Sequence, residues 1–254
     1  MDWPKISIIT PTLNQGKFIQ QTINSVLNQN YPNLEYIVMD GGSSDETLGI
    51  LRSYGKRLKW ISQRDNGQAD AINTGMELAS GEILAFINFD DYYLPGVFEM
   101  VARTFTRTNC KWLTGDYRIV DENDIDIQPL TIFYKRFWRN FSSPNLLFIL
   151  NYIVQPSTFW TRDLWNNIGL FDVSLQYALD YDLWNRAIKI SRPYIIKQPL
   201  SAFRIHGSSK GGSMFQNQFD EELQVLKRYN RNPFILRAHQ FHNFLIKSIY
   251  KIIK

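Results

Sequence analysis

The stretch Ile6-Ser7-Ile8-Ile9-Thr10-Pro11-Thr12-Leu13-Asn14 gives the clearest indication of the fold. Its first five residues form a mainly β-branched run, and polar residues follow soon after. A continuous run of this kind suits a strand that is buried on both faces, as in a parallel sheet. Runs of four or five residues with the same character recur at residues 36–39, 58–61 and 83–87. We therefore predict four parallel strands in the first hundred residues.

Between these runs the apolar residues follow helical spacing. They are Phe18, Ile19, Ile23, Val26 and Leu27, then Leu48, Leu51 and Tyr54, then Ala71, Ile72, Met76, Leu78 and Ala79. Strands that alternate with helices in this way predict an open α/β sheet with right-handed crossovers. In such a sheet, ligands bind beyond the carboxyl ends of the strands.

Polar residues follow all four predicted strands. The segments are Pro11-Thr12-Leu13-Asn14, Asp40-Gly41-Gly42-Ser43-Ser44-Asp45, Asp65-Asn66-Gly67-Gln68 and Asn88-Phe89-Asp90-Asp91. Any one of them is explained by the preference of Asp, Asn, Ser and Gly for turns and helix caps. Because all four are expected at one edge of one sheet, we predict a binding site there.

The adjacent acids Asp90 and Asp91 favour a metal site. Two neighbouring carboxylates repel one another unless a cation lies near them. Their oxygen atoms suit Mg²⁺ or Mn²⁺, which typically bind one or two protein carboxylates together with the phosphates of a substrate. We therefore expect a divalent cation after the fourth strand.

Two later segments also carry reactive side chains. Asp180 and Asp182 open a predicted helix, where one of them is explained as an N-cap and the other is then available as a base. The Gly- and Ser-rich segment 204–213 contains Arg204, His206 and Lys210. Cations and backbone N–H groups on a mobile loop of this kind can close over a diphosphate.

The composition excludes several classes of protein. The chain has 254 residues, a formal charge of +4 and a single cysteine, Cys110, which excludes an intramolecular disulfide and a cysteine-based zinc site. With 44% apolar and 20% charged residues, it is predicted to fold around a core. The first residues lack the layout of a signal peptide, and no apolar stretch is long enough to span a bilayer. We expect a cytoplasmic protein.

The charge is distributed unevenly along the chain. No acidic residue follows Glu222, whereas seven Lys or Arg residues do, so a neutral-to-acidic body precedes a basic tail. This distribution argues against binding to nucleic acid. The tail predicts a last helix that opens at Pro233, with one apolar line and, on another face, three lysines. The apolar line is Phe234, Ala238, Phe241, Leu245, Ile249 and Ile252, and the lysines are Lys247, Lys251 and Lys254.

This last helix is compatible with three roles. It is a basic amphipathic helix suited to the inner face of a membrane, or a helix packed on the domain with solvated lysines, or a site of self-association. The aromatic cluster in the middle of the chain is equally open: Phe133, Tyr134, Phe137, Trp138 and Phe141. Stacking on sugars, a membrane-facing loop or core packing would each explain the aromatic residues of this region, and core packing is expected for most of them.

The motifs named above, in this order, resemble glycosyltransferase family 2, whose members are inverting enzymes with a GT-A fold. Three further segments resemble the acceptor-side motifs of that family: Gln155-Pro156-Ser157-Thr158-Phe159-Trp160, Gly169-Leu170-Phe171-Asp172 and Asp180-Tyr181-Asp182-Leu183-Trp184. The resemblance covers residues 5–210. It implies a GT-A domain at residues 1–215, divided into a nucleotide-sugar half (1–105) and an acceptor half (106–215). A helical tail follows at residues 216–254.

The resemblance also implies a reaction. A hexosyl or hexosaminyl group would move from a nucleotide-diphosphate sugar, with a UDP-sugar favoured, to a hydroxyl of a glycan, glycoprotein or lipid-linked acceptor. Bacterial members of this kind often build surface polysaccharides. By resemblance, Asp180 is the general base, and Asp90, Asp91 and His206 hold Mn²⁺ or Mg²⁺. The donor would lie against Pro11, Thr12, Asn14, Asp40, Asp65, Gln68, Asn88 and Asp90.

The sequence departs from the family pattern at several positions, including Asp40-Gly41 in place of an acid doublet and Phe89 in place of a small residue. Leu13 replaces an aromatic residue, Asn88 replaces the first acid of the metal-binding motif, and Leu179 replaces an acid before the base. The apolar Leu179 is expected to raise the pKa of Asp180. A non-catalytic nucleotide-sugar or glycan-binding member is therefore the alternative. A nicotinamide oxidoreductase is disfavoured, because the first βα turn has Gly16 alone and no G-x-G-x-x-G motif.

Overall fold

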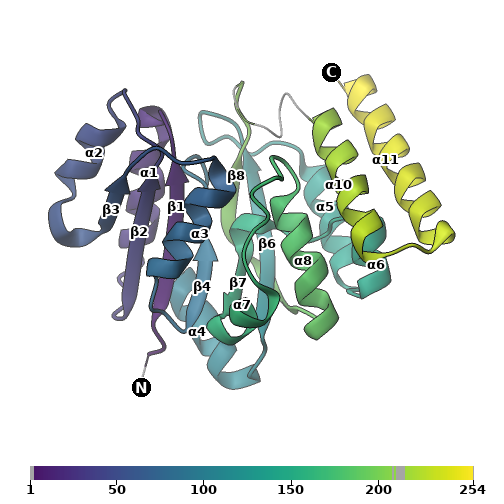
Figure 1. Ribbon diagram of the computed structural model, residues 1–254, viewed down its shortest axis with the longest axis horizontal. Coiled ribbons are helices and arrows are strands. Elements are labelled where there is room, and N and C mark those ends of the chain that lie inside the picture. Colours follow the sequence, from purple (N-terminus) through teal and green to yellow (C-terminus); the bar gives the residue numbers. More distant parts are fainter. Residues whose placement is uncertain (1–2, 208, 210–214, 254) are drawn as a thin grey trace.

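One mixed eight-stranded sheet crosses the protein, and helices cover both of its faces (Figure 1). The structure is a computed structural model, and it describes residues 3–207, 209 and 215–253. The strand order is β3-β2-β1-β4-β7-β6-β8-β5. The strands are β1 (Ile6–Thr12), β2 (Leu34–Asp40), β3 (Lys59–Ser62), β4 (Ile83–Phe86), β5 (Tyr92–Tyr93), β6 (Trp112–Val120), β7 (Thr158–Thr161) and β8 (Tyr194–Arg204).

The helices alternate with these strands in the first half of the chain and gather at one end of the sheet in the second. They are α1 (Gly16–Leu27), α2 (Thr47–Ser53), α3 (Gln68–Leu78), α4 (Val97–Thr108), α5 (Pro129–Arg139), α6 (Pro144–Ile149), α7 (Arg162–Ile168), α8 (Leu179–Ile190), α10 (Phe215–Tyr229) and α11 (Pro233–Ile253). Two short 3₁₀ turns, η1 (Gly55–Arg57) and η2 (Gln155–Ser157), complete the set of described helices.

The four predicted strands form the parallel half of the sheet, β3-β2-β1-β4. The predicted open α/β architecture is confirmed. One detail was wrong: β3 is not buried on both faces, since Lys59 and Ser62 at its ends are exposed. The reason is its place at the edge of the sheet, where it has a neighbour on one side only.

The second half of the sheet is mixed. β7 runs antiparallel to both β4 and β6, while β6 and β8 run parallel. The short strand β5 pairs antiparallel with β8, with Tyr92 opposite Ala202. This pairing holds the segment after β4 against the end of β8.

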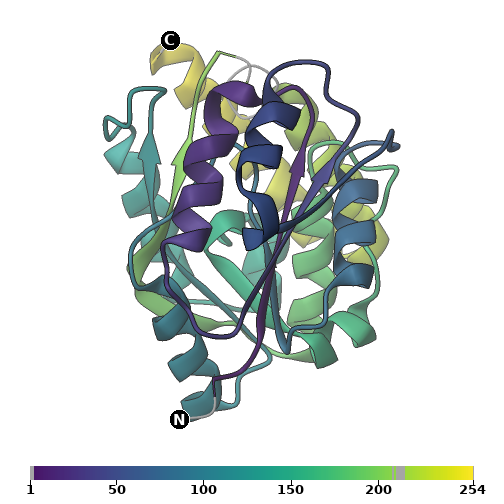
Figure 2. The same cartoon turned by 90° about the vertical axis from the view of Figure 1, so that its left-hand side faces the viewer.

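Two hydrophobic layers lie on opposite faces of the sheet (Figure 2). Successive side chains of a strand point to opposite faces, so the neighbours Ile8 and Ile9 belong to different layers. Ile8 packs in the layer formed with α1, α2 and α4. Ile9 packs in the layer formed with α3, α7 and α8.

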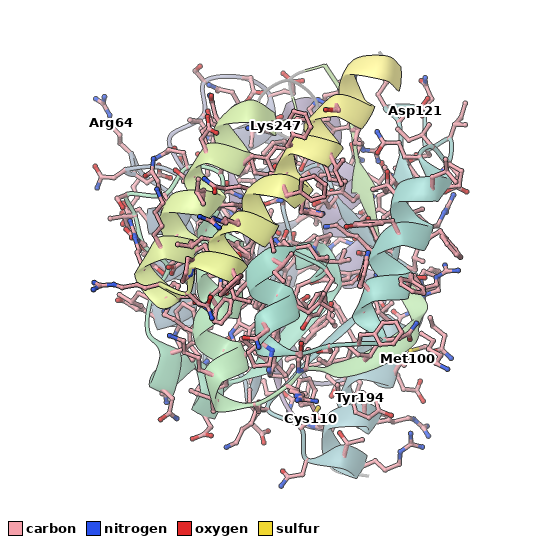
Figure 3. All side chains as sticks on the ribbon, turned by 90° about the vertical axis from the view of Figure 1, so that its right-hand side faces the viewer. Arg64, Met100, Cys110, Asp121, Tyr194 and Lys247 are labelled. Atoms are coloured by element: carbon pink, nitrogen blue, oxygen red, sulfur yellow. The ribbon has the colours of Figure 1, made fainter. Side chains whose placement is uncertain are left out.

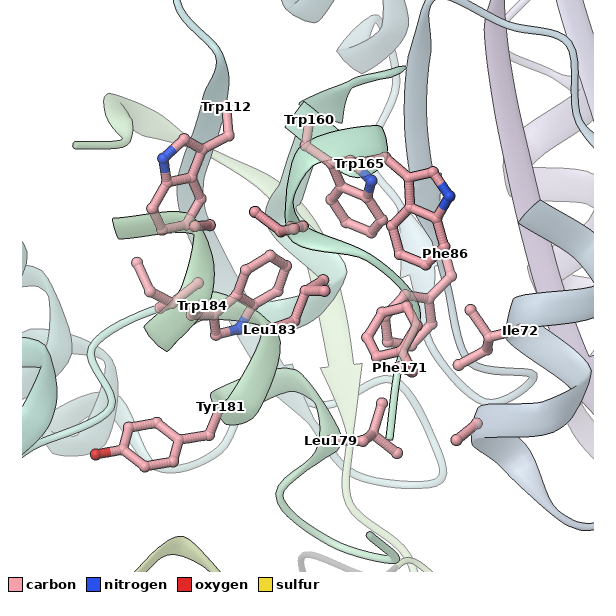
Figure 4. Packing of buried hydrophobic residues seen from close by; sticks show 14 of the residues in the cluster. Ile72, Phe86, Trp112, Trp160, Trp165, Phe171, Leu179, Tyr181, Leu183 and Trp184 are labelled. Carbon is pink, nitrogen blue, oxygen red and sulfur yellow. The ribbon is translucent and has the colours of Figure 1, made fainter. Parts of the chain in front are cut away.

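Tryptophans fill the core beside the second half of the sheet (Figure 4). The rings of Trp112 and Trp184 stack with their centroids 5.6 Å apart, and Trp160 meets Trp184 edge to face at 5.6 Å. Full burial of a large side chain contributes about 1.5–3 kcal/mol, so this cluster is a main source of stability. The core does not include three members of the 133–141 cluster: Phe133, Phe137 and Phe141 are 65%, 46% and 59% exposed.

The C-terminal helices lie at the far end of the sheet from α2 (Figure 1). α10 packs on α8, and α11 packs on α6 and α10. None of the helices in the described ranges combines the length and apolarity that a membrane span requires. Two of the predicted cations, Lys210 and Lys254, lie outside the described residues, and so does the side chain of Lys251. Of the 208–214 loop, the structure describes Ser209 alone.

Candidate active site

The carboxyl ends of β1, β2 and β3 lie side by side, at the upper edge of the sheet in Figure 1. The register places Thr12 opposite Asp40 and Asp40 opposite Ser62. The loops after these strands and after β4 carry the residues that the sequence predicts around the donor. The structure brings them together at one edge, because parallel strands end on the same side.

The loops after β1 and β2 are fastened to each other through Asn14. Its backbone N–H donates to Ser43 Oγ at 2.7 Å, and its Oδ1 accepts from the Ser44 N–H at 2.8 Å. Asn14 has a positive φ of 53°, a region that asparagine enters more readily than most residues. The Asn14 side chain thus fixes the shape of the predicted nucleotide pocket.

Thr12 and Pro11 are buried at the end of β1. The Thr12 hydroxyl has no hydrogen-bond partner among the described residues. Buried polar atoms in folded proteins are almost always hydrogen-bonded, either to protein or to a bound molecule. The Thr12 hydroxyl is thus an enclosed polar atom without a protein partner, on the residue that lies opposite Asp40 in the sheet.

Asp40 is 1% exposed, and its carboxylate shapes the turn that follows β2. It accepts hydrogen bonds from the backbone N–H groups of Gly42 (3.1 Å) and Ser43 (3.0 Å) and from the hydroxyls of Ser43 and Ser62. Four hydrogen bonds nearly fill the acceptor capacity of a carboxylate. In this structure Asp40 holds the loop in place, and direct contact with the base stays a prediction.

Asp65 lies close to the turn that Asp40 shapes. Its Oδ1 accepts from the Gly67 N–H at 2.9 Å. Its Oδ2 stands so near Gly41 that a Cβ at that position would come within 2.8 Å. A glycine at position 41 is therefore required for the loops after β2 and β3 to approach.

A chain of amides links the third and fourth loops. Gln68 Nε2 donates to Asn88 Oδ1 at 2.7 Å, and Asn88 Nδ2 lies 3.3 Å from Gln155 Oε1. Gln155 Nε2 in turn donates to the carbonyl of Phe86, at the end of β4. The segment Gln155-Pro156-Ser157 thus lies against the donor side of the sheet, although its family motif is assigned to the acceptor side.

Asp90 and His206 meet across the sheet edge. Asp90 Oδ2 lies 3.0 Å from His206 Nε2, and the two side chains are 12% and 5% exposed. The His206 ring also packs on Phe18, with ring centroids 4.7 Å apart. The β5–β8 pairing explains the meeting, since Asp90 lies two residues before β5 and His206 two residues after β8.

Asp91, the third predicted metal ligand, points elsewhere. It is fully buried, and its Oδ1 accepts from the backbone N–H of Arg204 at 2.9 Å. Burial, followed by the charge of Asp90, raises the pKa of Asp91 well above its ordinary value. Its position supports a structural role.

The predicted metal ligands suit a divalent cation only if a bound substrate supplies further ligands. Among the residues that the structure describes, no group of three or more His, Cys, Asp or Glu side chains could hold a metal ion. Asp90 and His206 would supply two metal ligands. Mg²⁺ and Mn²⁺ usually bind few protein ligands together with the phosphates of a nucleotide, so two are enough.

Arg204 is a buried structural cation, and the expectation that it belongs to a mobile loop was wrong. It is 1% exposed at the end of β8. Its guanidinium donates to Gln21 at 2.6 Å, to the Asp90 carbonyl at 3.0 Å and to Asp124 at 2.9 Å. These contacts hold the backbone of Asp90 in place.

The two acids of α8 have different partners. The N-cap of the helix is Ala178, so neither acid is the predicted cap. Asp182 accepts from Arg186 at 2.8 Å and from the Tyr229 hydroxyl at 2.6 Å. Asp180 accepts only a hydrogen bond from the adjacent Tyr181 N–H among the contacts that the structure gives for it. Asp182 therefore acts structurally, and Asp180 is left for the role of base.

Burial raises the pKa of the Asp180 carboxyl, as the sequence predicts. The charge of Lys135, on α5, opposes this rise, and the charge of Glu221 adds to it. A second buried acid, Glu222, lies close enough to interact with both Asp180 and Lys135, and burial raises its pKa to about 7. Asp180 thus belongs to a cluster of charges on three helices, α5, α8 and α10.

Sequence reasoning missed the residue that holds the start of α8. Glu221 accepts hydrogen bonds from the backbone N–H groups of Gln176 (3.0 Å), Tyr177 (2.6 Å) and Ala178 (2.6 Å). In the sequence Glu221 is the middle residue of an acidic triplet on a predicted helix, and nothing there signals a partner 43 residues away.

A family comparison decides between the fold classes that share such a sheet. The model of the family described as "Glycosyl transferase family 2" matches residues 7–165, which is more than half of the chain. The chain belongs to this family. It is a glycosyltransferase, and the expectation from its motifs is confirmed.

One curated relative of this glycosyltransferase covers almost its whole length. It is the Escherichia coli UDP-Glc:alpha-D-GlcNAc-diphosphoundecaprenol beta-1,3-glucosyltransferase WfgD, with 29% identity over 99% of this chain and 96% of WfgD.

Solved structures of two other proteins have the same fold. Staphylococcus aureus TarS 1–349 in complex with UDP-GlcNAc superposes with a TM-score of 0.69 at 19% identity, over 87% of this chain and 65% of the TarS chain. The mannosyltransferase PcManGT from Pyrobaculum calidifontis, in complex with GDP-Man and Mn²⁺, gives a TM-score of 0.69 at 18% identity, over 93% of this chain and 69% of PcManGT. The GT-A fold is confirmed by these likenesses.

Proposed function

We propose that this glycosyltransferase moves a sugar from a nucleotide-diphosphate donor, most favourably a UDP-sugar, to a hydroxyl of a lipid-linked glycan. One observation carries the proposal: the Asp90–His206 pair lies at the sheet edge where the predicted donor loops end. The pair alone has too few ligands for a divalent cation, and the phosphates of a bound diphosphate would supply the rest. The names of the relatives support it: WfgD uses UDP-Glc and a diphosphoundecaprenol acceptor, and TarS binds UDP-GlcNAc.

In the proposed reaction the acceptor oxygen forms a bond to the anomeric carbon as the bond from that carbon to the diphosphate breaks. Asp180 takes the proton of the attacking hydroxyl, and the nucleoside diphosphate leaves. Attack from the face opposite the leaving group inverts the anomeric centre. A divalent cation, when bound by Asp90 and His206, would neutralise charge on the departing diphosphate.

The raised pKa of Asp180 suits this role. A carboxylate becomes a stronger base as its pKa rises, provided that it is still ionised at the working pH. The charge of Lys135 opposes the effect of burial and so favours the ionised form of Asp180. The donor side of the site is built mainly of loops after parallel strands, and the acceptor side of helices α5, α8 and α10.

A non-catalytic role in nucleotide-sugar or glycan binding is the second candidate, favoured by Asn88 in place of an acid. An amide can bond a ribose hydroxyl but is a poorer cation ligand than a carboxylate.

Transfer assays separate the two candidates. UDP-Glc, UDP-GlcNAc, GDP-Man and a dTDP-sugar are offered with a synthetic GlcNAc-diphospholipid, with and without Mn²⁺, and the anomeric configuration of the product is read by NMR. We expect a product with inverted anomeric configuration. Asp180→Asn should abolish its formation, and Asp182→Asn should reduce the transfer rate less. Donor binding by calorimetry without transfer or hydrolysis would instead favour the binding role.

A lipid-linked acceptor places the protein, in this proposal, at the cytoplasmic face of a membrane. Supply of its acceptor then depends on an enzyme that attaches the first sugar phosphate to the lipid. Transfer of further sugars by other enzymes would lead to a surface polysaccharide.

A further inference from the structure

The exposed aromatic residues of this protein are not scattered. Fifteen large apolar side chains are exposed in the described part of the chain, and eight of them lie on α5, the turn after it and α11. All six exposed phenylalanines of that part belong to these eight. The α5 stripe is Leu130, Phe133, Phe137 and Phe141, and the α11 stripe is Phe234, Phe241, Phe244 and Leu245.

Both stripes follow the period of their helices. Steps of three and four residues place the members of each stripe on one side of the helix. The members are 44–77% exposed, so each stripe faces outward.

The inner side of α11 carries two buried polar residues beside Ile235 and Leu236, which pack against the core. His239 and Asn243 are buried there, and His239 Nδ1 lies 3.0 Å from the carbonyl of Ile149 and 3.1 Å from that of Phe148. Burial lowers the pKa of His239 to about 4, so its ring is neutral near neutral pH. Phe234, Phe241 and Leu245 of the predicted apolar line are exposed, although α11 itself packs on α6 and α10.

The two stripes form one surface. α5 and α11 touch through Tyr134 and His242, whose hydroxyl and Nε2 atoms are 2.7 Å apart and whose rings stack. Each of these residues directly follows a member of its stripe in the sequence, and the two helices run in roughly opposite directions (Figure 3). For antiparallel right-handed helices, this arrangement turns both stripes toward the same side.

Charge indicates what covers this surface. Residues 127–162 and 223–254, which contain both helices, have no Asp or Glu, whereas they hold four and seven Lys or Arg residues respectively. Arg136 and Arg237 are exposed on the two helices themselves, and Arg136 also pairs with Asp116. A second copy of the same basic face would be repelled, and an anionic surface would be attracted.

We propose that the α5 and α11 stripes together dock this protein on an anionic lipid bilayer, with the phenylalanines entering the headgroup region. Aromatic and basic residues are the usual components of such interfacial contacts. α5 also carries Lys135, whose charge acts on Asp180, so the docking surface and the acceptor side of the site share this helix. The docking rests on the surface alone and does not depend on the proposed reaction.

Vesicle binding by the full chain tests the proposal. The vesicles are phosphatidylcholine with an equal share of phosphatidylglycerol, and pure phosphatidylcholine serves for comparison. We expect preferential sedimentation with the anionic vesicles that weakens at high salt. The double variants Phe133→Ser with Phe137→Ser, and Phe241→Ser with Phe244→Ser, should each weaken binding about tenfold. The control, Leu78→Ser with Ile190→Ser, removes two exposed apolar residues elsewhere and should leave binding unchanged.

Three results would overturn the proposal. The wild-type chain could fail to bind anionic vesicles, or the α5 double variant could bind as tightly as the wild type. Sedimentation equilibrium could instead show a dimer that the phenylalanine variants turn into a monomer, which would make a second copy the true partner. Thermal melting of each variant, expected to match the wild type because the altered residues are exposed, checks that the fold is intact.

Discussion

Glu221 Oε2 lies 2.6 Å from the backbone nitrogen of Ala178, two residues before Asp180. The same carboxylate accepts from two further backbone N–H groups, so the C-terminal helix α10 holds the first turn of α8 in place. A carboxylate near a helix N-terminus also interacts favourably with the helix dipole. Glu221 is therefore a positioning residue for the proposed base.

Replacement of this carboxylate should reduce transfer without weakening donor binding. In Glu221→Gln one acceptor oxygen becomes an amide nitrogen, which cannot accept from the backbone N–H groups. We expect kcat to fall about tenfold or more, while the dissociation constant of UDP, measured by calorimetry, stays within twofold. Asp220→Asn, which removes a surface carboxylate from the same helix, is the control and should behave as the wild type. Loss of UDP binding in Glu221→Gln would indicate general unfolding instead of misplacement of Asp180.

The pH dependence of transfer should report the charge of Lys135. Burial raises the pKa of Asp180, and the ammonium group of Lys135 lowers it again. Lys135→Met removes that charge, so the acid limb of the kcat/KM profile should move to higher pH. Lys197→Met, at an exposed position on β8, should leave the profile where it is. An unchanged acid limb in Lys135→Met would show that Asp180 is not the group that titrates.

Stability should respond to pH through Glu222. Its pKa is about 7 in the folded chain and near 4.5 when unfolded, so the folded state binds an additional proton between these values. Ionisation of this buried acid therefore costs stability progressively as pH rises from 4.5 to 7, and the full cost persists above 7. Glu222→Gln should raise Tm at pH 8, by an amount equivalent to about 1–3 kcal/mol, and change it little at pH 4.5. Glu77→Gln, on the exposed side of α3, is the matched control, and an equal effect at both pH values would contradict the prediction.

Metal dependence should distinguish Asp90 from Asp91. Asp90→Asn should weaken the Mn²⁺-dependent part of UDP binding at least tenfold, because it removes the accessible carboxylate of the Asp90–His206 pair. Asp91→Asn should affect this part much less, since Asp91 is buried against the Arg204 backbone. Calorimetric titration of UDP with and without Mn²⁺ measures both. If Asp91→Asn has the larger effect, the buried acid must turn toward the cation when the donor binds.

Much of the donor side of the site could be predicted from the sequence. Buried parallel strands leave a strong local signal, and their ends must meet at one edge, so the meeting of Asn14, Asp40 and Asn88 follows from topology. The sequence could not reveal which groups each carboxylate at this edge would contact. The four hydrogen bonds of Asp40 and the burial of Asp91 depend on neighbours that only the assembled loops supply.

The acceptor side was harder to predict, because its contacts join distant parts of the chain. The Glu221–Ala178 bond requires α10 to dock on α8, and no periodicity indicates that docking. The same holds for the phenylalanines of α5 and α11: an apolar residue at helical spacing is usually packed inward, and here His239 and Asn243 are buried on the inner side of α11 while the phenylalanines are exposed.

The Asp90–His206 pair has a consequence for the order in which the protein matures. Its two members are 116 residues apart, and they meet only after β8 has paired with β5 and β6. During synthesis, the nucleotide half of the sheet leaves the ribosome long before β8 is made, and contacts of such long range form late in folding. A nascent chain therefore carries every loop of the donor pocket while it still lacks half of its cation site.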